Sequence, residues 1–164
     1  MRRAADGDGS ALERLYALTA NSLYSYLCRL AGSRSDADDL LQTTFMHAWR
    51  SKQSFRGDGA RAWLFTIARN AFLTHAGRNR DLTEVAPHVA QPATPGEQFA
   101  AIDLSRRVEA AMTELPHDTR EAVILSRLSG LSVRDIAALL ETSEGNVRVR
   151  IHRGLTQLKK HLEE

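Results

Sequence analysis

The sequence predicts an all-α protein with two helical domains joined by a linker. Apolar residues recur at helical spacing over most of the 164 residues, while runs of β-branched residues are few. With 43% hydrophobic and 26% charged residues, the composition fits one or two small soluble domains. We predict an N-terminal domain at 1–80, a linker at 81–101 and a C-terminal domain at 102–164.

Three helices are predicted in the N-terminal domain, which is expected to be a three- or four-helix bundle. The first begins near Ser10 and ends at Gly32, and the second is capped by Ser35. Three aspartates lie in the first turn of this second helix, where carboxylates favour the positive end of the helix dipole. After the loop SFRGDG, a third helix runs from about Ala60 to His75. The buried stripe of this third helix is expected to hold Trp63, Leu64, Ile67, Ala68 and Ala71. The apolar side of the second helix is expected to hold Leu40, Leu41, Phe45, Ala48 and Trp49.

Residues 81–100 lack the helical periodicity of the sequence on either side. The stretch DLTEVAPHVAQPATPGEQFA contains three prolines, one glycine and no lysine or arginine. Because proline fixes the backbone and lacks an amide donor, this stretch is predicted to be a linker. As a flexible coil it would hold its ends roughly 25 Å apart, which lets the two domains bind separate sites.

Helical periodicity resumes from Ile102 to Leu162. Pro116 is predicted to begin a helix, where its missing amide does no harm, and Gly130 ends that helix. Ser132 with Asp135 fits a capping box at the start of the next, short helix.

The last two predicted helices read as a helix-turn-helix. In SVRDIAALLETSEGNVRVRIHRGLTQLKK the second helix begins at Ser143 and carries an apolar stripe. A helix-turn-helix needs this division, because the first helix braces while the second presents polar groups to bases and cations to phosphates. From Gly145 through Leu162 there are five lysines and arginines and no acid, whereas ordinary surface helices mix both signs. The alternative is a helical hairpin with a solvated basic face. The side predicted to face duplex DNA holds Asn146, Arg148, Val149, Arg150, His152, Arg153 and Thr156, with Ser143 at its start.

A second basic segment lies between Arg50 and Arg80. It holds seven lysines and arginines and one acid, interleaved with aromatic residues. Such a mixture suits single-stranded nucleic acid, because bases stack on rings while the backbone follows cations. Trp63 lies on the apolar stripe and is expected in the core. Phe55, beside the glycine-containing loop, is the better candidate for an accessible ring.

Composition excludes several other kinds of site. Cys28 is the only cysteine, so the chain holds no disulfide of its own and no CxxC-type metal site. The six histidines are scattered without metal-binding spacing. No signal peptide is visible, and no segment approaches the roughly 20 apolar residues of a membrane span. We therefore expect a cytoplasmic protein with no cofactor and no metal.

Two stretches resemble a known protein family. DADDLLQTTFMHAW followed by FRGDGARAWLFTIARN resembles the second conserved domain of bacterial extracytoplasmic-function (ECF) sigma factors. LPHDTREAVILSRLSGLSVRDIAALLETSEGNVRVRIHRGLTQLK is similar to their fourth domain. The resemblance implies a dissociable, promoter-recognising subunit of RNA polymerase that is not itself an enzyme. Its implied partners are core RNA polymerase, promoter DNA and an anti-sigma factor, and the chain is expected to be a monomer when free of them.

The resemblance also implies roles for particular residues. Asp39, Gln42 and Thr43 would dock on the clamp helices of the largest polymerase subunit, and the flap of the second largest subunit is a further expected contact. The recognition helix would read the −35 element through the residues given above. The loop at 54–61 and the helix after it would bind the −10 element and capture an unstacked base. The residues expected at the melted strand are Phe55, Arg56, Asp58, Arg61 and Asn70.

Three positions depart from the family pattern. Thr43 stands where a glutamate is common, Thr74 where an aspartate is common, and Glu141 where the helix-turn-helix turn usually has glycine.

Two other functions fit parts of the sequence. A regulator that binds operator DNA as a dimer would use the helix-turn-helix but leaves the N-terminal basic segment unexplained. A sigma-like mimic would sequester an anti-sigma factor without binding DNA. Such a mimic would need no strip of cations, because it makes no phosphate contacts.

Overall fold

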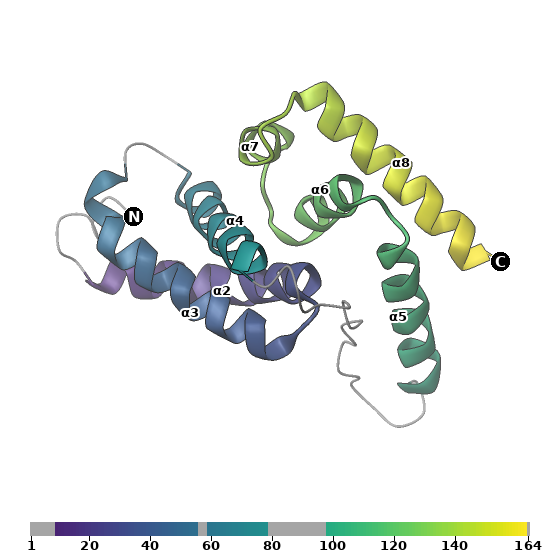
Figure 1. Cartoon of the computed structure of the whole chain (residues 1–164), viewed down its shortest axis with the longest axis horizontal. Helices are drawn as coiled ribbons and strands as arrows, with labels where there is room; N and C mark the ends of the chain where they lie inside the picture. Colours follow the sequence, from purple (N-terminus) through teal and green to yellow (C-terminus); the bar gives the residue numbers. More distant parts are fainter. Residues whose placement is uncertain (1–8, 56–58, 79–97, 164) are drawn as a thin grey trace.

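The computed structural model describes residues 9–55, 59–78 and 98–163 of the chain. Within these ranges the structure is helical and has no strand, which confirms the all-α prediction (Figure 1). The order is α2 (Gly9–Ala31), α3 (Arg34–Ser51), the short 3-10 helix η1 (Lys52–Ser54), α4 (Ala60–Arg78), α5 (Gln98–Thr113), α6 (His117–Leu128), α7 (Val133–Leu139) and α8 (Glu144–Glu163).

Helices α2, α3 and α4 pack on one another and form what we call the N-terminal unit (Figure 1). Its core contains Leu23, Leu27, Leu64 and Phe65, all fully buried. Phe65 therefore belongs to the core, although the predicted stripe of this helix did not include it. Trp63 and Ile67 of the predicted stripe are only partly buried and pack at its edge.

The first helix boundary agrees with the prediction, and the second differs. α2 ends at Ala31, and Gly32 follows in the left-handed region with a φ of 68°, as expected for a glycine stop. The predicted cap Ser35 is wrong, because α3 already begins at Arg34 and Ser33 is its cap. Ser33 has extended backbone, and its Oγ accepts a hydrogen bond from the Asp36 amide at 3.2 Å.

Helices α5 to α8 form the C-terminal unit. α5 begins at Gln98, so the helix starts inside the stretch predicted as linker, and residues 81–97 of that stretch lie outside the described residues. α8 packs against α5, α6 and α7. Gly154 is buried where α8 crosses α6, since a Cβ at this position would lie 2.5 Å from Cγ2 of Val123.

The two units also pack against each other, through α2 with α6 and through α4 with α7 (Figure 1). The centre of this contact is polar, with the Tyr26 hydroxyl donating a hydrogen bond of 2.8 Å to Glu121. The sequence predicted two domains free to bind separate sites, and nothing in its helical patterns indicated this contact.

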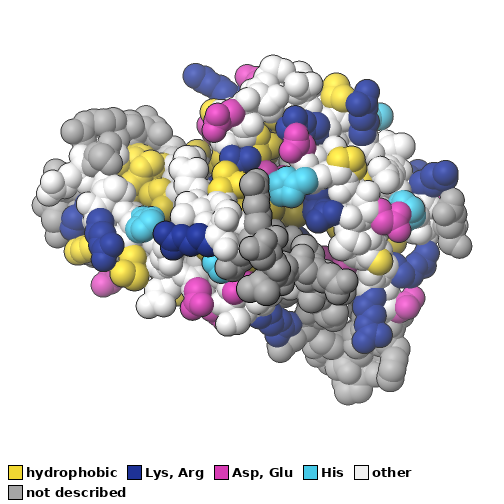
Figure 2. Space-filling view, viewed as in Figure 1, with side chains coloured by type: hydrophobic (Ala, Val, Ile, Leu, Met, Phe, Trp, Pro, Cys, Tyr) yellow, Lys and Arg dark blue, Asp and Glu magenta, His cyan; other side chains and the backbone are white. Residues whose placement is uncertain are grey.

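Charges of both signs are spread over the surface. On the face that Figure 2 shows, lysine and arginine side chains alternate with acidic ones over both units. In the described part of the chain, no helix is both long and apolar enough to cross a membrane.

Candidate nucleic-acid and protein interfaces

The predicted helix-turn-helix is present as α7, a short turn and α8. Ser132 caps α7, with its Oγ accepting from the Asp135 amide at 3.1 Å and donating to the Asp135 carboxylate at 2.7 Å. Ser143 caps α8 by accepting from the Asn146 amide at 3.1 Å. Both predicted caps are confirmed. Together they fix where the two helices begin and therefore the angle at which α8 leaves the turn.

The turn itself contains the departure from the family pattern. Glu141 has a φ of 53°, in the left-handed region that suits glycine. For an L-residue other than glycine this conformation costs about 1–2 kcal/mol. Glu141 therefore adopts the backbone conformation that glycine would adopt in this turn, at a cost in stability. The absence of glycine lowers the stability of the turn but does not change its geometry.

The predicted DNA-facing side of α8 points into solvent, whereas Val147, Gly154 and Leu158 are buried against the rest of the C-terminal unit. This division between a buried and an exposed side agrees with the predicted roles, in which α7 braces α8 and α8 presents side chains to DNA. Asn146 is exposed and donates from Nδ2 to the Thr142 hydroxyl at 3.2 Å. The exposed members of the predicted set are Ser143, Asn146, Arg148, Val149, His152, Arg153 and Thr156.

Two arginines of α8 have acidic partners within the chain. Arg148 pairs with Glu144 at 2.9 Å, one helical turn earlier. Arg150 pairs with Asp118 of α6 at 3.0 Å, and its side chain is only 26% exposed. Sequence reasoning missed Asp118, because 32 positions separate it from Arg150 and no helical pattern connects them. Arg153 is exposed and has no ion-pair partner among the residues that the structure describes.

The aromatic ring expected to be accessible is not. Phe55 is 7% exposed and packs edge-on against Trp63, with ring centroids 5.3 Å apart. Trp63, which covers the ring, lies in the first turn of α4. The expectation of an exposed Phe55 is therefore wrong for this arrangement. Arg56 and Asp58, also predicted at the melted strand, lie outside the described residues.

Arg61, predicted to contact the melted strand, reaches across to the C-terminal unit. Its guanidinium donates to the backbone carbonyl of Ser129, at the end of α6. It also donates to the Leu18 carbonyl and to the Ser22 hydroxyl of α2, both at 3.3 Å. In this arrangement the Arg61 guanidinium donates its hydrogen bonds to acceptors within the protein.

Asn70 is exposed on α4 and lines a pocket of about 330 Å³ between α3 and α4. The same pocket is lined by Asp39 and Thr43, which were predicted to dock on polymerase. The structure thus brings together residues to which different roles were assigned. The other lining residues are Leu40, His47, Ala71, Thr74, His75 and Arg78.

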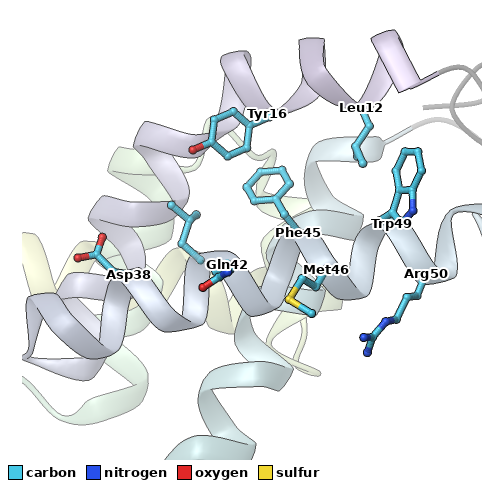
Figure 3. Close-up of a pocket in the computed structure, with 9 residues that line it drawn as sticks. Leu12, Tyr16, Asp38, Gln42, Phe45, Met46, Trp49 and Arg50 are labelled. Carbon is cyan, nitrogen blue, oxygen red and sulfur yellow. The ribbon is translucent and has the colours of Figure 1, made fainter.

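Gln42, the third predicted docking residue, lies on a different surface. It lines a groove of about 680 Å³ between α2 and α3, together with aromatic and apolar side chains (Figure 3). Tyr16 of α2 and Phe45 of α3 face each other across it, with ring centroids 4.7 Å apart. We call this surface the α2–α3 groove; it is lined by Leu12, Tyr16, Asp38, Leu41, Gln42, Phe45, Met46, Trp49 and Arg50.

The α2–α3 groove is unusual in leaving large apolar side chains in water. Trp49 and Met46 are each 45% exposed, and Tyr16 is 50% exposed. The amine of Lys52 sits 3.3 Å from the centre of the Trp49 ring, a cation–π contact. Such a rimmed apolar surface marks a site of protein–protein contact. Sequence reasoning assigned Trp49 and Phe45 to a buried side, because periodicity alone does not distinguish a core stripe from an exposed one.

Two family models match this chain in consecutive regions. Sigma-70 region 2 matches residues 15–81, and Sigma-70, region 4 matches residues 105–158. The first match covers most of the N-terminal unit and of the α2–α3 groove, and the second covers most of the C-terminal unit with the helix-turn-helix.

Several characterised proteins are similar over most of the chain. The chain is 35% identical to the RNA polymerase sigma factor CarQ of Myxococcus xanthus, over 100% of this chain and 96% of that one. It is 33% identical to the ECF RNA polymerase sigma-E factor of Haemophilus influenzae, over 99% and 93%. With the ECF RNA polymerase sigma factor SigE of Mycolicibacterium smegmatis it shares 35% identity, spanning 96% of this chain but 65% of that longer protein.

Two solved structures have a similar fold. CnrH, solved in complex with the cytosolic domain of CnrY, superimposes with a TM-score of 0.76 at 28% identity, covering 99% of this chain and 94% of that one. The sigma factor RpoE from Bartonella quintana, solved in complex with the anti-sigma factor NepR, gives a TM-score of 0.76 at 30% identity, covering 92% and 96%. This chain therefore belongs to the ECF family of RNA polymerase sigma factors.

Proposed function

We propose that this chain binds core RNA polymerase in the cytoplasm and directs it to a specific set of promoters. The observation that carries the proposal is the pairing of two regions in one chain of this family. One presents an apolar docking groove, and the other presents a helix suited to the major groove of DNA. An operator-binding dimer would need only the second of these surfaces.

Polymerase docking is proposed for α3. Gln42 and the exposed Met46 and Trp49 offer a mixed polar and apolar strip of the kind that anchors protein interfaces, where a few large side chains supply most of the affinity. Asp39 and Thr43 lie on the adjoining face of the same helix, so a partner helix laid along α3 would meet both sets.

Reading of the −35 element is proposed for α8. Asn146 presents an amide oxygen that suits a base amino group, and Val149 presents an apolar contact for a thymine methyl. Arg153 and Arg148 are proposed to contact phosphates, together with Ser143 and His152. Arg150, held by Asp118, is proposed to contact DNA only when that pair exchanges partners.

Contact with the −10 element is proposed for the pocket of Asn70. A pocket of about 330 Å³ between two helices has room for a nucleobase, and its side chains Asn70, Thr43 and Asp39 offer donors and acceptors. Phe55 is buried against Trp63 and is not proposed to stack on a base, and Arg61 is proposed to contact the strand when it leaves Ser129.

Two further statements follow from the proposal. Phosphodiester chemistry belongs to the polymerase, so the chain contributes recognition and no catalytic group. A relative from Bartonella quintana was solved with an anti-sigma factor, and we propose that an anti-sigma factor also regulates this chain by covering the α2–α3 groove.

Gel filtration with core RNA polymerase from the source organism tests the docking step. The wild-type chain is expected to co-elute with core, whereas Trp49→Ala is expected to weaken the complex at least about tenfold, a typical cost of losing an interface anchor. Leu104→Ala is the matched control, since Leu104 is an exposed apolar residue of α5, whereas the groove is lined by α2 and α3. Equal binding by all three proteins would contradict docking through the groove.

The rival functions give different results. An operator-binding regulator would protect a two-fold DNA site without polymerase, and a mimic would bind an anti-sigma factor but show no salt-dependent affinity for promoter DNA in the presence of core polymerase.

A further inference from the structure

An acidic side chain outside the helix-turn-helix is paired with an arginine of α8. Asp118 lies in the first turn of α6, and its Oδ2 accepts a hydrogen bond from Arg150 Nη2 at 3.0 Å, within an ion pair. The contact joins two helices that pack directly on each other, so the fold positions both members of the pair. The Asp118 side chain is 66% exposed, and its charge therefore reaches the surface beside α8.

Arg150 lies within the side of α8 that is proposed to face DNA. Asn146 precedes it by four positions and Arg153 follows it by three, and these spacings place residues on one face of a helix. Both neighbours are exposed. A duplex that contacts Asn146 and Arg153 therefore comes close to Arg150 and also to the carboxylate of Asp118.

The two ion pairs of α8 differ in how firmly they hold their arginines. Glu144 and Arg148 belong to the same helix, and their side chains are 45% and 62% exposed. Pairs this exposed contribute little, because water and salt screen them. Arg150 is only 26% exposed, and its partner comes from another helix. Asp118 is therefore a stronger competitor for a DNA phosphate than Glu144 is.

The surroundings of Asp118 keep its carboxylate in place. The first turn of a helix suits a carboxylate, because the positive end of the helix dipole lies there. The second oxygen, Oδ1, lies 3.8 Å from Nδ1 of His117. A carboxylate offers an arginine the same kind of charged acceptor as a phosphate does. When Arg150 moves to a phosphate, Asp118 loses its partner and stays beside the negative DNA backbone, and both effects oppose binding.

We propose that Asp118 sets the DNA affinity of α8 by competing with a promoter phosphate for Arg150. The competition withholds one cation from the duplex, so binding through α8 alone stays weak. Promoter use then requires the second contact, at the −10 element. This inference rests on the proposed function, and Asp118 acts only through Arg150.

Binding of the full-length chain to a random-sequence duplex of about 20 base pairs tests the competition. Such a probe suffices because phosphate contacts do not depend on sequence. Asp118→Asn frees Arg150, so the slope of log affinity against log salt concentration should become steeper by about 1. In fluorescence anisotropy the variant should bind about fourfold more tightly than wild type at about 50 mM salt, and nearly equally at about 200 mM.

Two controls separate this competition from a change in net charge. Glu163→Gln removes the same charge at the far end of α8, where Glu163 pairs with Lys159 at 3.6 Å, about 20 Å along the helix from Arg150. It should change affinity by less than about twofold, because salt screens charges at this distance. In an Arg150→Ala background, Asp118→Asn should add nothing.

Three results would overturn the competition. They are an unchanged affinity in Asp118→Asn, an equal gain in Glu163→Gln, or a gain that persists in the Arg150→Ala background. Circular dichroism is expected to show the same helical content in all variants.

Run-off transcription with core polymerase tests the consequence for promoter choice. Two templates are compared at the lower salt, one with an intact −10 element and one with a single base of that element changed. Asp118→Asn should raise transcription from the changed template relative to the intact one by about two- to fourfold. An unchanged ratio overturns the link to promoter choice. Transcription by the wild type with no gain in duplex affinity in Asp118→Asn defeats this inference alone, whereas no transcript from the wild type defeats the proposed function.

Discussion

Gly154 offers the sharpest test of how α8 is held against the C-terminal unit. It is buried at the crossing of α8 with α6, and a methyl group there has no room. An added Cβ would lie 2.5 Å from Val123 Cγ2 and 3.0 Å from Thr119 Cγ2, against about 3.5–4.0 Å for an ordinary carbon contact. The substitution Gly154→Ala therefore has to push α8 and α6 apart or force both neighbours to move.

The magnitude follows from two opposing effects. Overpacking by one methyl group costs about 1–3 kcal/mol, and relief is hard here because β-branched side chains such as those of Val123 and Thr119 have few helical rotamers. Alanine gains about 1 kcal/mol over glycine in a helix interior. We expect Gly154→Ala to lower the free energy of unfolding by up to about 2 kcal/mol.

Gly145 provides the matched control on the same helix. Its added Cβ would meet nothing closer than Ser143 Oγ at 3.9 Å, so Gly145→Ala is expected to gain about 0.5–1 kcal/mol from helix propensity alone. Urea unfolding followed by circular dichroism measures both variants. If Gly154→Ala proved as stable as Gly145→Ala, the close packing of α8 on α6 would be refuted.

Three other predictions follow from particular contacts. Glu141→Gly should raise stability by about 0.5–1 kcal/mol by relieving the left-handed conformation, measured by urea unfolding, whereas Glu141→Ala, which keeps that strain, should not. Because the folded-state pKa of Tyr26 is raised, its stabilisation is complete below the unfolded value near 10 and is lost above it. Stability should thus fall by about 1.4 kcal/mol per pH unit above pH 10 in wild type, and Tyr26→Phe should lack this contribution. Arg153→Ala should weaken binding to −35 duplex DNA and reduce the slope of log affinity against log salt concentration by about 1. Arg150→Ala should change this slope less, because Asp118 already neutralises the Arg150 side chain. Equal slopes for the two variants would contradict this difference.

Helix order and caps were accessible from sequence because they depend on nearby residues. The i, i+4 stripe of α8 and the caps Ser132 and Ser143 are local patterns, and the structure confirms them. Ser35 was a wrong choice for the same local reason: Ser33 is an equally good cap two residues earlier, and the extended backbone that decides between them is invisible in the sequence.

The candidate sites were less accessible, because exposure depends on contacts between distant segments. Phe55 looked accessible beside glycines, but it is buried against Trp63. Trp49 looked buried by its spacing, but it is exposed in the α2–α3 groove. Glu121 is buried only because Tyr26 and Arg69 pair with it, and these partners lie 95 and 52 positions away.

Run-off transcription in vitro, with start sites mapped on genomic DNA fragments, tests the central claim most directly. Core RNA polymerase from the source organism is expected to initiate at a shared promoter sequence only when this chain is added. Arg153→Ala should reduce that transcription, and Trp49→Ala should reduce it through weaker docking. Failure of core polymerase with the wild-type chain to initiate at any promoter would contradict the account.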